Sequence, residues 1–377
     1  MWKVLDSWIH RYFGNEEAVL LSLLMLLSLI VVFTLSDVLA PFLAALVFAF
    51  LLQGAVARLK RWGLPHAAAV TLVFTSFIGL FLLAVIFLVP IVIEQSANLM
   101  AEMPGMLRKW QAAVLLLPEK YPQFISEQRL AELMHYVTSE SSRVAEAALS
   151  FSISKFSNVI GILVYLVLVP LLVFFMLKDK DELSSTLGDL LPAERPVMNQ
   201  VWMEMNIQMA NYVRGKAVEI LIVGATTYVS FKLLGVNYAA LLSLLVGFSV
   251  VIPYIGAAVV TLPVMLVGYF QWGWSGDFFW LFMVYTFIQF LDGNVLVPLL
   301  FSEAVNLHPI AIILAVLFFG GVWGVWGVFF AIPLATLIKA LYNAWPRNGE
   351  ASLYSDKASE INDLPGESVE PVANLEG

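Results

Sequence analysis

Long apolar runs separated by short polar segments dominate the chain from residue 18 onward. In the first half, four such runs occupy residues 18–35, 38–57, 67–93 and 158–177. A helix crosses the ~30 Å hydrocarbon core of a bilayer with about 20 predominantly apolar residues. The pattern therefore predicts three transmembrane helices within residues 18–93 and a fourth within residues 151–177.

The apolar pattern changes in the C-terminal region, residues 217–345, where two of the runs are interrupted at their centres. Predicted spans at 217–234 and 278–291 are each followed by a split pair of short runs. The first pair is split at Pro253–Gly256 and the second at Gly320–Gly327. A helix of about 14 residues rises only about 21 Å, so the short runs do not cross a bilayer by themselves.

Two structures fit each split pair. One is a re-entrant hairpin, whose tip must be buried in protein or line an aqueous cavity because an irregular backbone cannot face lipid. The other is a single long helix kinked at Gly or Pro. Hairpins would produce the order span, hairpin, span, hairpin, which is an inverted repeat of the kind found in secondary transporters. We predict an all-α polytopic integral membrane protein with about eight membrane segments, in which the two split segments are candidates for re-entrant hairpins.

Polar segments divide these spans. We expect a cytoplasmic N-terminal segment at residues 1–17, an external helical cap at 94–150, a cytoplasmic amphipathic linker at 178–216 and a disordered acidic cytoplasmic tail at 346–377. Within the cap, Pro104, Pro118 and Pro122 are expected to interrupt the helices.

Positive charge predicts the orientation. The densest basic segment is the loop that contains Arg58, Lys60 and Arg61. Because short basic loops remain in the cytoplasm, we expect this loop and the N-terminus inside. Counting spans from there also places the C-terminus in the cytoplasm.

Composition excludes most other classes of protein. The chain has 377 residues, of which 60% are hydrophobic and 13% charged, against about 45–50% and about 25% in soluble domains. Its net charge is −8, and the tail, with seven acidic residues against two basic ones, accounts for most of it. No cluster of Lys and Arg suited to a nucleic acid is found in the sequence. Cysteine, His-Glu-x-x-His, P-loop and Gly-x-Ser-x-Gly motifs are all missing. We therefore expect no enzyme, no catalytic residue, no metal site and no cofactor.

The strongest candidate site follows the span at 278–291. Gln289, Asp292 and Asn294 lie where that apolar run meets a polar stretch. An ionisable group at membrane depth is costly and is by default a functional candidate, and its oxygens together with carboxamide oxygens can hold Na⁺ or a proton beside a polar solute. The alternative is a membrane-edge turn with Asp292 in water and Gly293 supplying a positive φ. The residues alone leave both open.

Other positions have two interpretations as well. Arg214, just before the span at 217–234, is either an anchor to lipid phosphate or a contact for a substrate anion. The glycines at 320, 321, 324 and 327 suit either close helix packing or a hairpin tip.

Five ordered motifs stand out between Tyr212 and Pro333. They are Tyr212–Lys216, Val251–Gly256, Leu291–Pro298, Leu307–Pro309 and the glycine-rich run that ends at Ala331–Pro333. Together they resemble the autoinducer-2 exporter family of permease-like transporters, and the likeness extends over nearly the whole chain. The resemblance implies constrained positions at Arg214, Pro253, Gly256, Gln289, Asn294, Pro298 and Pro309. Residue 292, frequently Glu in that family, is Asp here.

We therefore predict a secondary-active permease of the bacterial inner membrane, exporting a small polar solute or autoinducer-2-like signal coupled to H⁺ or Na⁺. The expected substrate or ion ligands are Asp292, Asn294, Gln289 and Arg214. The expected structural or hinge positions are Pro253, Gly256, Pro298, Pro309, Gly320, Gly324, Gly327 and Pro333. The alternatives are a Na⁺/H⁺ antiporter of the same family and a membrane scaffold or assembly factor without transport. The expected partners are membrane lipid, the solute with its ion, and further copies of the chain in a homo-oligomer.

Overall fold

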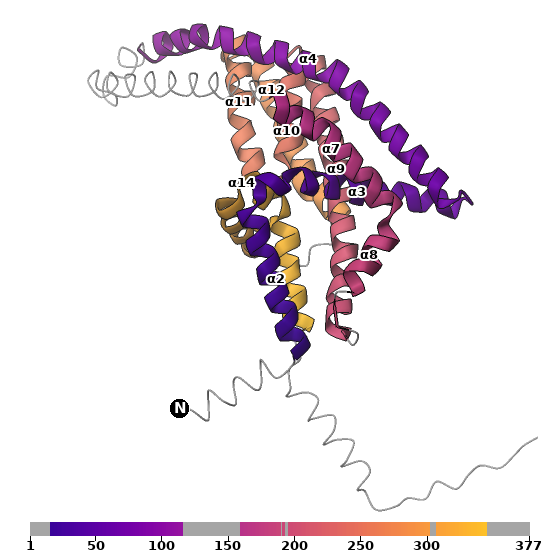
Figure 1. Cartoon of the computed structure of the whole chain (residues 1–377). Coiled ribbons are helices and arrows are strands. Elements are labelled where there is room, and N and C mark those ends of the chain that lie inside the picture. Colours follow the sequence, from indigo (N-terminus) through magenta and orange to yellow (C-terminus); the bar gives the residue numbers. More distant parts are fainter. Residues whose placement is uncertain (1–15, 116–158, 190, 193–194, 302–306, 345–377) are drawn as a thin grey trace, which may run out of the picture.

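The structure is a computed structural model that describes residues 16–115, 159–189, 191–192, 195–301 and 307–344 (Figure 1). All regular secondary structure in these ranges is helical. The elements are α2 (Glu16–Thr34), α3 (Ser36–Arg61), α4 (His66–Leu115), α7 (Val159–Lys178), α8 (Lys180–Asp189), α9 (Pro196–Leu234), α10 (Ala239–Ser249), α11 (Ile255–Trp272), α12 (Gly276–Leu291), the π-helical turn η1 (Asp292–Leu296), α13 (Val297–Phe301) and α14 (Pro309–Ala344). The prediction of an all-α membrane protein is confirmed.

In the described ranges, six segments are long and apolar enough to cross a membrane. They are Val38–Arg61, His66–Met106, Pro196–Leu234, Ile255–Trp272, Gly276–Phe301 and Pro309–Asn343. Three shorter apolar helices accompany them, at Val19–Val32, Val164–Lys178 and Ala239–Ser249. The most apolar window of α4 has none of its residues buried, so its side chains suit contact with lipid.

Two boundaries differ from the sequence predictions. Helix α4 continues through Pro90 and Pro104 as far as Leu115, so the prediction of a helix break at Pro104 was wrong. The rest of the predicted external cap, with Pro118 and Pro122, lies outside the described residues. The predicted linker at 178–216 is also not separate from the span that follows it, because α9 is a single helix of 39 residues. Apolar periodicity did not reveal this continuity, because the first half of α9 is polar and the second half is apolar.

The first predicted break, at Pro253–Gly256, separates α10 from α11. The chain leaves α10 at Val250, and Tyr254 adopts a positive φ of 62° before α11 begins. A Cβ atom at Gly256 would lie 1.8 Å from the carbonyl oxygen of Ser249. Only glycine therefore allows the two helices to approach so closely at this turn.

The second predicted break lies inside α14, where Gly324 has φ 61° and ψ −137°. The two halves of α14 pack against each other across it, since a Cβ at Gly327 would lie 1.9 Å from the Phe319 carbonyl oxygen and one at Gly320 would lie 2.7 Å from Val328. Nothing lies within 4 Å of a Cβ at Gly324 itself. Glycine suits position 324 through its backbone conformation, which an L-residue rarely adopts.

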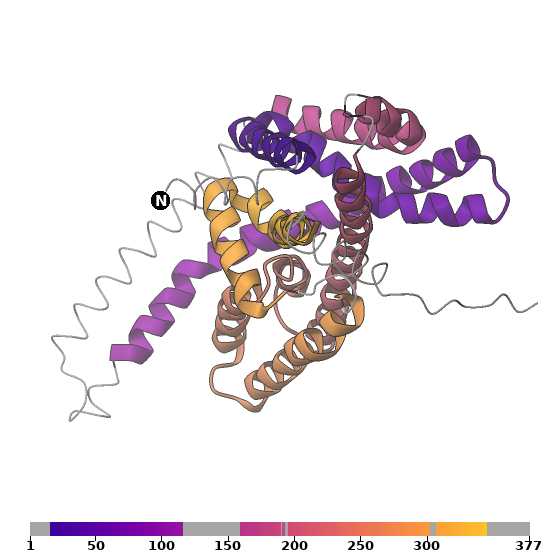
Figure 2. The ribbon, with the colours of Figure 1, turned by 90° about the horizontal axis from the view of Figure 1, so that it is seen from below.

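Helix α9 is the central element of the fold. It contacts α2, α3, α10, α12, α13 and α14, while α3 contacts α7 most extensively and also contacts α4 and α9 (Figure 2). The α3–α4–α7 contact is a cluster of small and β-branched residues that includes Ala45, Val70 and Val173. Such residues allow close helix approach where lipid removes the hydrophobic driving force.

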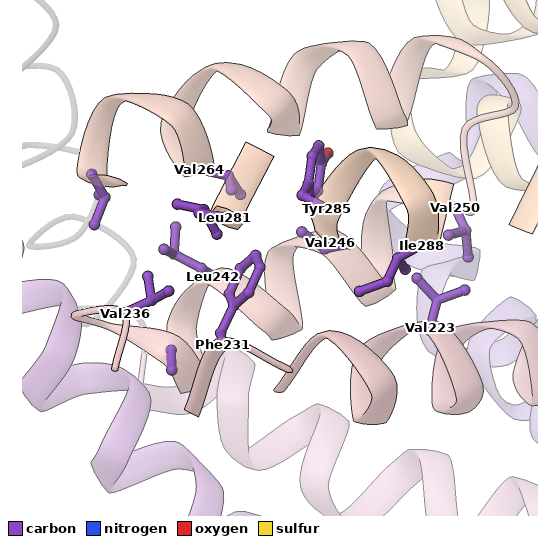
Figure 3. Close-up of a cluster of buried hydrophobic side chains, with 12 residues drawn as sticks. Val223, Phe231, Val236, Leu242, Val246, Val250, Val264, Leu281, Tyr285 and Ile288 are labelled. Carbon is purple, nitrogen blue, oxygen red and sulfur yellow. The ribbon is translucent and has the colours of Figure 1, made fainter. Parts of the chain in front are cut away.

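A second buried cluster joins α9 to α10, α11 and α12 (Figure 3). Phe231, Leu242 and Leu281 are completely buried in it. The hydroxyl of Tyr285 lies 3.0 Å from that of Thr261, so the polar end of this buried ring has a partner. This core positions the broken segment between α10 and α11 relative to α9.

Candidate functional site

A cavity of about 500 Å³ lies between α9, the break that joins α10 to α11, the α12–η1–α13 segment and α14. Its wall combines the ionisable side chains of Lys216, Glu219 and Asp292 with a larger apolar surface. The lining residues are Tyr212, Lys216, Glu219, Val250, Ile252, Pro253, Tyr254, Ala257, Gln289, Asp292, Gly293, Val297, Pro298, Phe301, Ile312 and Ile332.

Helix α9 contributes the polar face. Tyr212, Lys216 and Glu219 are spaced at i, i+4 and i+7, which places them on one side of the helix. All three are almost completely buried, with exposed fractions of 2%, 5% and 1%. A stripe of this kind inside an apolar helix marks the surface that α9 turns toward the cavity.

Lys216 connects α9 to the first break. Its Nζ donates to Glu219 Oε2 at 2.7 Å and to the carbonyl oxygen of Val250 at 2.8 Å. Val250 ends α10, so this carbonyl belongs to a helix terminus that has lost its own helical partner and favours a cation. Lys216 Nζ also lies 5.1 Å from the centre of the Phe301 ring, a cation–π distance.

Tyr212 connects the same face of α9 to α14. Its hydroxyl donates to the carbonyl oxygen of Phe329 at 2.9 Å. Pro333 is four residues further along α14 and has no N–H, so the Phe329 carbonyl lacks its usual helical donor. The hydroxyl of Tyr212 replaces that donor, and this is a structural reason for Pro333 at its predicted structural position.

Asp292 is the first residue of η1, a π-helical turn between α12 and α13. π-Turns inside α-helices occur frequently at functional sites. Asp292 Oδ1 and Gln289 Nε2 are both buried, and neither has a hydrogen-bond partner among the described residues. Both residues line the cavity. The cavity wall therefore contains one hydrogen-bond acceptor, Asp292 Oδ1, and one donor, Gln289 Nε2, without partners. The two residues lie about one helical turn apart.

The turn alternative for Asp292 does not describe this segment. Asp292 has helical angles of −58° and −58°, and Gly293 is not among the glycines with a positive φ. The chain continues helically from α12 through η1 into α13. Pro298 suits this geometry, since it has no N–H to take part in either an α- or a π-type hydrogen bond.

Two of the four predicted ligands lie apart from the cavity wall. Asn294 is exposed and donates from Nδ2 to the carbonyl oxygen of Phe290 at 2.9 Å. Arg214 is exposed on the other face of α9, where it donates to the Ala210 carbonyl and to Asn211 Oδ1. The position of Arg214 away from the cavity follows from its spacing, because a residue two positions from both Tyr212 and Lys216 points to a different side of the helix.

The predicted structural positions have several different environments. Pro253 and Pro298 line the cavity. Gly256, Gly320 and Gly327 lie at close backbone or side-chain contacts, and Gly324 has the positive φ described above. Pro309 begins α14, where its missing N–H costs no helical hydrogen bond.

Sequence reasoning missed Glu219 and treated Lys216 only as a neighbour of Arg214. A signal was available, because Glu219 is an acid inside the apolar run of the predicted span and lies three residues after a lysine. An intramembrane acid with a base at i+3 spacing is itself a candidate site.

In the described part of the chain, no group of three His, Asp or Glu side chains gathers closely enough to hold a metal ion.

Comparison with known proteins identifies the family. The profile of the AI-2E family transporter matches residues 20–347. This chain belongs to the AI-2E transporter family. PerM of Escherichia coli (strain K12), named as a candidate permease, is 45% identical over 346 residues, which are 92% of this chain and 98% of PerM.

More distant relatives have names of the same kind. YueF of Bacillus subtilis (strain 168), named as a candidate transport protein, is 26% identical over 335 residues, which are 85% of this chain and 90% of YueF. The AI-2 transport protein TqsA of Escherichia coli (strain K12) is 24% identical over 309 residues, which are 81% of this chain and 85% of TqsA. The chain is therefore a permease-type membrane transporter, in agreement with the sequence prediction, and its family is not a family of enzymes.

Proposed function

We propose that this AI-2E family member is a secondary-active permease whose cavity binds a small polar solute together with one monovalent cation. The observation that carries the proposal is the pair of buried, unmatched polar atoms, Asp292 Oδ1 and Gln289 Nε2, on the wall of a cavity of about 500 Å³. A buried polar atom without a partner is destabilising unless a ligand supplies the missing hydrogen bond.

Charge accounting supports the binding of a cation. The cavity wall has one base, Lys216, and two acids, Glu219 and Asp292. Lys216 is hydrogen-bonded to Glu219, so Asp292 is the acid without a direct counter-charge. Because an isolated charge in a low-dielectric site is costly, one H⁺ or Na⁺ at Asp292 would neutralise the set.

The solute is proposed to be small and uncharged, with both donor and acceptor groups. Its acceptor would meet Gln289 Nε2 and its donor would meet Asp292 Oδ1, while Val297, Ile312 and Ile332 provide apolar contacts. TqsA is named for transport of AI-2, so autoinducer-2 is the first solute to test.

The two broken segments are proposed to be re-entrant hairpins that close opposite sides of the cavity. Support comes from the close packing of the two halves of α14 and from Pro253 and Tyr254 at the cavity wall. Engineered cysteines at Tyr254 and Val325, which are 61% and 82% exposed, would then react with a small aqueous thiol reagent. A cysteine at Leu80 on the exposed side of α4 would not react, and the chain has no native cysteine to interfere. Reaction at Leu80 and protection at both tips would contradict re-entry.

Flux in proteoliposomes tests the transport proposal. Vesicles with purified protein are loaded with autoinducer-2, and efflux is followed under an imposed H⁺ or Na⁺ gradient. Asp292→Asn should abolish coupled efflux, and Asp292→Glu should keep part of it because the carboxylate remains. Asp277→Asn, at the exposed start of the same helix, is the matched control and should transport normally. Normal coupled efflux by Asp292→Asn would overturn the proposal.

The same vesicles separate the alternatives. A Na⁺/H⁺ antiporter would move H⁺ against Na⁺ without any solute, which an internal pH dye detects. A scaffold or assembly factor would show no flux of either kind. Orientation and assembly remain proposals too: we propose cytoplasmic termini in the bacterial inner membrane and a homo-oligomer, which cysteine labelling near Ser184 and crosslinking in the membrane would test.

A further inference from the structure

A second, smaller cavity of about 140 Å³ lies between the C-terminal end of α3, the start of α4 and the junction of α7 with α8. It shares no lining residue with the transport cavity. Its wall contains both apolar and polar side chains. The lining residues are Ala49, Gln53, Val56, Ala57, Lys60, His66, Met176, Leu177, Lys180 and Asp181.

His66 is held in a defined orientation at this cavity. Its Nε2 lies 3.0 Å from the carbonyl oxygen of Lys178. Because a carbonyl oxygen only accepts, Nε2 carries the hydrogen. The other ring nitrogen, Nδ1, is buried and has no partner among the described residues. The structure therefore contains a positioned ring nitrogen whose hydrogen-bonding capacity is unused.

The remaining charges of the wall are mainly positive. Lys60 and Lys180 face a single acid, Asp181, and in the described ranges neither ammonium group forms an ion pair. The cavity also lies at the start of α4, where the first N–H groups have no helical acceptor and attract anions. Two ammonium groups and a helix N-terminus would all stabilise a bound anion.

The position of the cavity distinguishes a lipid from a free anion. Ala49 and Val56 continue its wall along the apolar part of α3, and Met176 and Leu177 do so along α7. Trp62, 72% exposed, lies directly after the basic last turn of α3. Trp and basic residues at the end of an apolar helix are typical of the headgroup region of a membrane.

We propose that this cavity binds an anionic phospholipid headgroup, with Lys60 and Lys180 as ligands of the phosphate and Nδ1 of His66 as the acceptor for a headgroup hydroxyl. The acyl chains would then lie along the exposed apolar surface of α3 and α7. Basic pockets between membrane helices bind lipid headgroups by the same chemistry. The bound phosphate would join α3, α4 and the α7–α8 junction, which belong to the region that packs without buried charges.

Lipid retention on the full-length protein tests the site. The protein is purified in detergent, titrated with phosphatidylglycerol or phosphatidylcholine, and examined by native mass spectrometry and thermal unfolding. We expect phosphatidylglycerol to be retained and to raise the unfolding temperature, and phosphatidylcholine to do neither. A basic residue near a membrane contributes about fivefold to anionic lipid binding, so Lys60→Gln/Lys180→Gln should weaken retention by about 25-fold.

Two further variants keep the result independent of folding. Lys232→Gln changes an exposed lysine at the end of α9 and should retain the lipid like the wild type. Asp181→Asn removes the only acid of the cavity wall and should strengthen retention, which a misfolded protein would not do. Retention of phosphatidylglycerol unchanged by both the double variant and Asp181→Asn would overturn the proposal. Equal stabilisation by inorganic phosphate, lost in the same double variant, would assign the site to a free anion instead of a lipid.

Discussion

The α3–α4–α7 region and the α9–α14 region use the same apolar composition in different ways. In the first, Ala, Val and Leu pack three helices together, and every buried residue of the cluster is apolar. In the second, the helices are broken, and all the buried polar or charged residues of the described part of the chain are found there: Lys216, Glu219, Thr227, Ser243, Ser249 and Thr336. We therefore propose a scaffold role for the first region and a binding role for the second, because buried ionisable groups within a membrane are functional candidates by default.

Breaking the Lys216–Glu219 pair should have the largest effect. Lys216→Met leaves Glu219 buried without a counter-charge and should lower the free energy of unfolding by about 3–5 kcal/mol. Thermal unfolding in detergent measures the loss. In the scaffold region, Lys178→Met removes an exposed lysine whose ion pair with Asp179 is 3.6 Å long, and should cost less than about 1 kcal/mol.

The double variant Lys216→Met/Glu219→Met sharpens this result. It removes both charges and should recover most of the stability that Lys216→Met loses. Coupled flux should be absent in both the single and the double variant. Recovery of flux together with stability would contradict a functional role for the pair and would make it a structural feature only.

Two glycines of α14 provide the next comparison. Gly327→Ala places a Cβ against the backbone oxygen of Phe319 and should cost about 1–3 kcal/mol through overpacking. Gly321→Ala, where nothing lies within 4 Å of the new Cβ, should be neutral or stabilising by up to about 1 kcal/mol. Unfolding temperatures of the two variants measure the difference, and equal values would mean that the halves of α14 are not in contact.

A third comparison separates the two carboxamides beside Asp292. Gln289→Ala removes the unmatched donor of the cavity and should reduce solute flux about tenfold, the equivalent of one hydrogen bond. Asn294→Ala removes a side chain that only binds its own helix, and its flux should change less than about twofold. A greater loss in Asn294→Ala than in Gln289→Ala would return Asn294 to the site.

The smallest effect is expected in the scaffold. Gly79 lies within α4, and nothing lies within 4 Å of a Cβ built on it. Gly79→Ala should leave flux unchanged and alter the free energy of unfolding by less than about 1 kcal/mol, in the stabilising direction. Destabilisation comparable to that of Gly327→Ala would show that α4 is packed more closely than the structure has it.

The sequence by itself determined the class of the protein and the positions of most helices. Apolar runs long enough for a bilayer define α3 and α7 within a few residues, and the Pro and Gly clusters locate both breaks, at Pro253–Gly256 and near Gly324. These features are local, because helix length, proline and glycine act on the backbone where they occur. The motifs around Asp292 also predicted a candidate site in a segment that lines the larger cavity.

The tertiary structure alone decided which side chains meet. Asp292 is far from Lys216 and Tyr212 in the sequence, and only the packing of α9 against α10, α12 and α14 brings them to one cavity. Asn294, two residues from Asp292, faces away because neighbouring residues on a helix project in different directions. Two hydrogen bonds likewise depend on a helix end and a proline that meet α9 only in the folded chain: Lys216 donates to the Val250 carbonyl, and Tyr212 donates to the Phe329 carbonyl. Hydrophobic periodicity contains no information about such contacts, because it reports which face of a helix is apolar and not which helix lies against it.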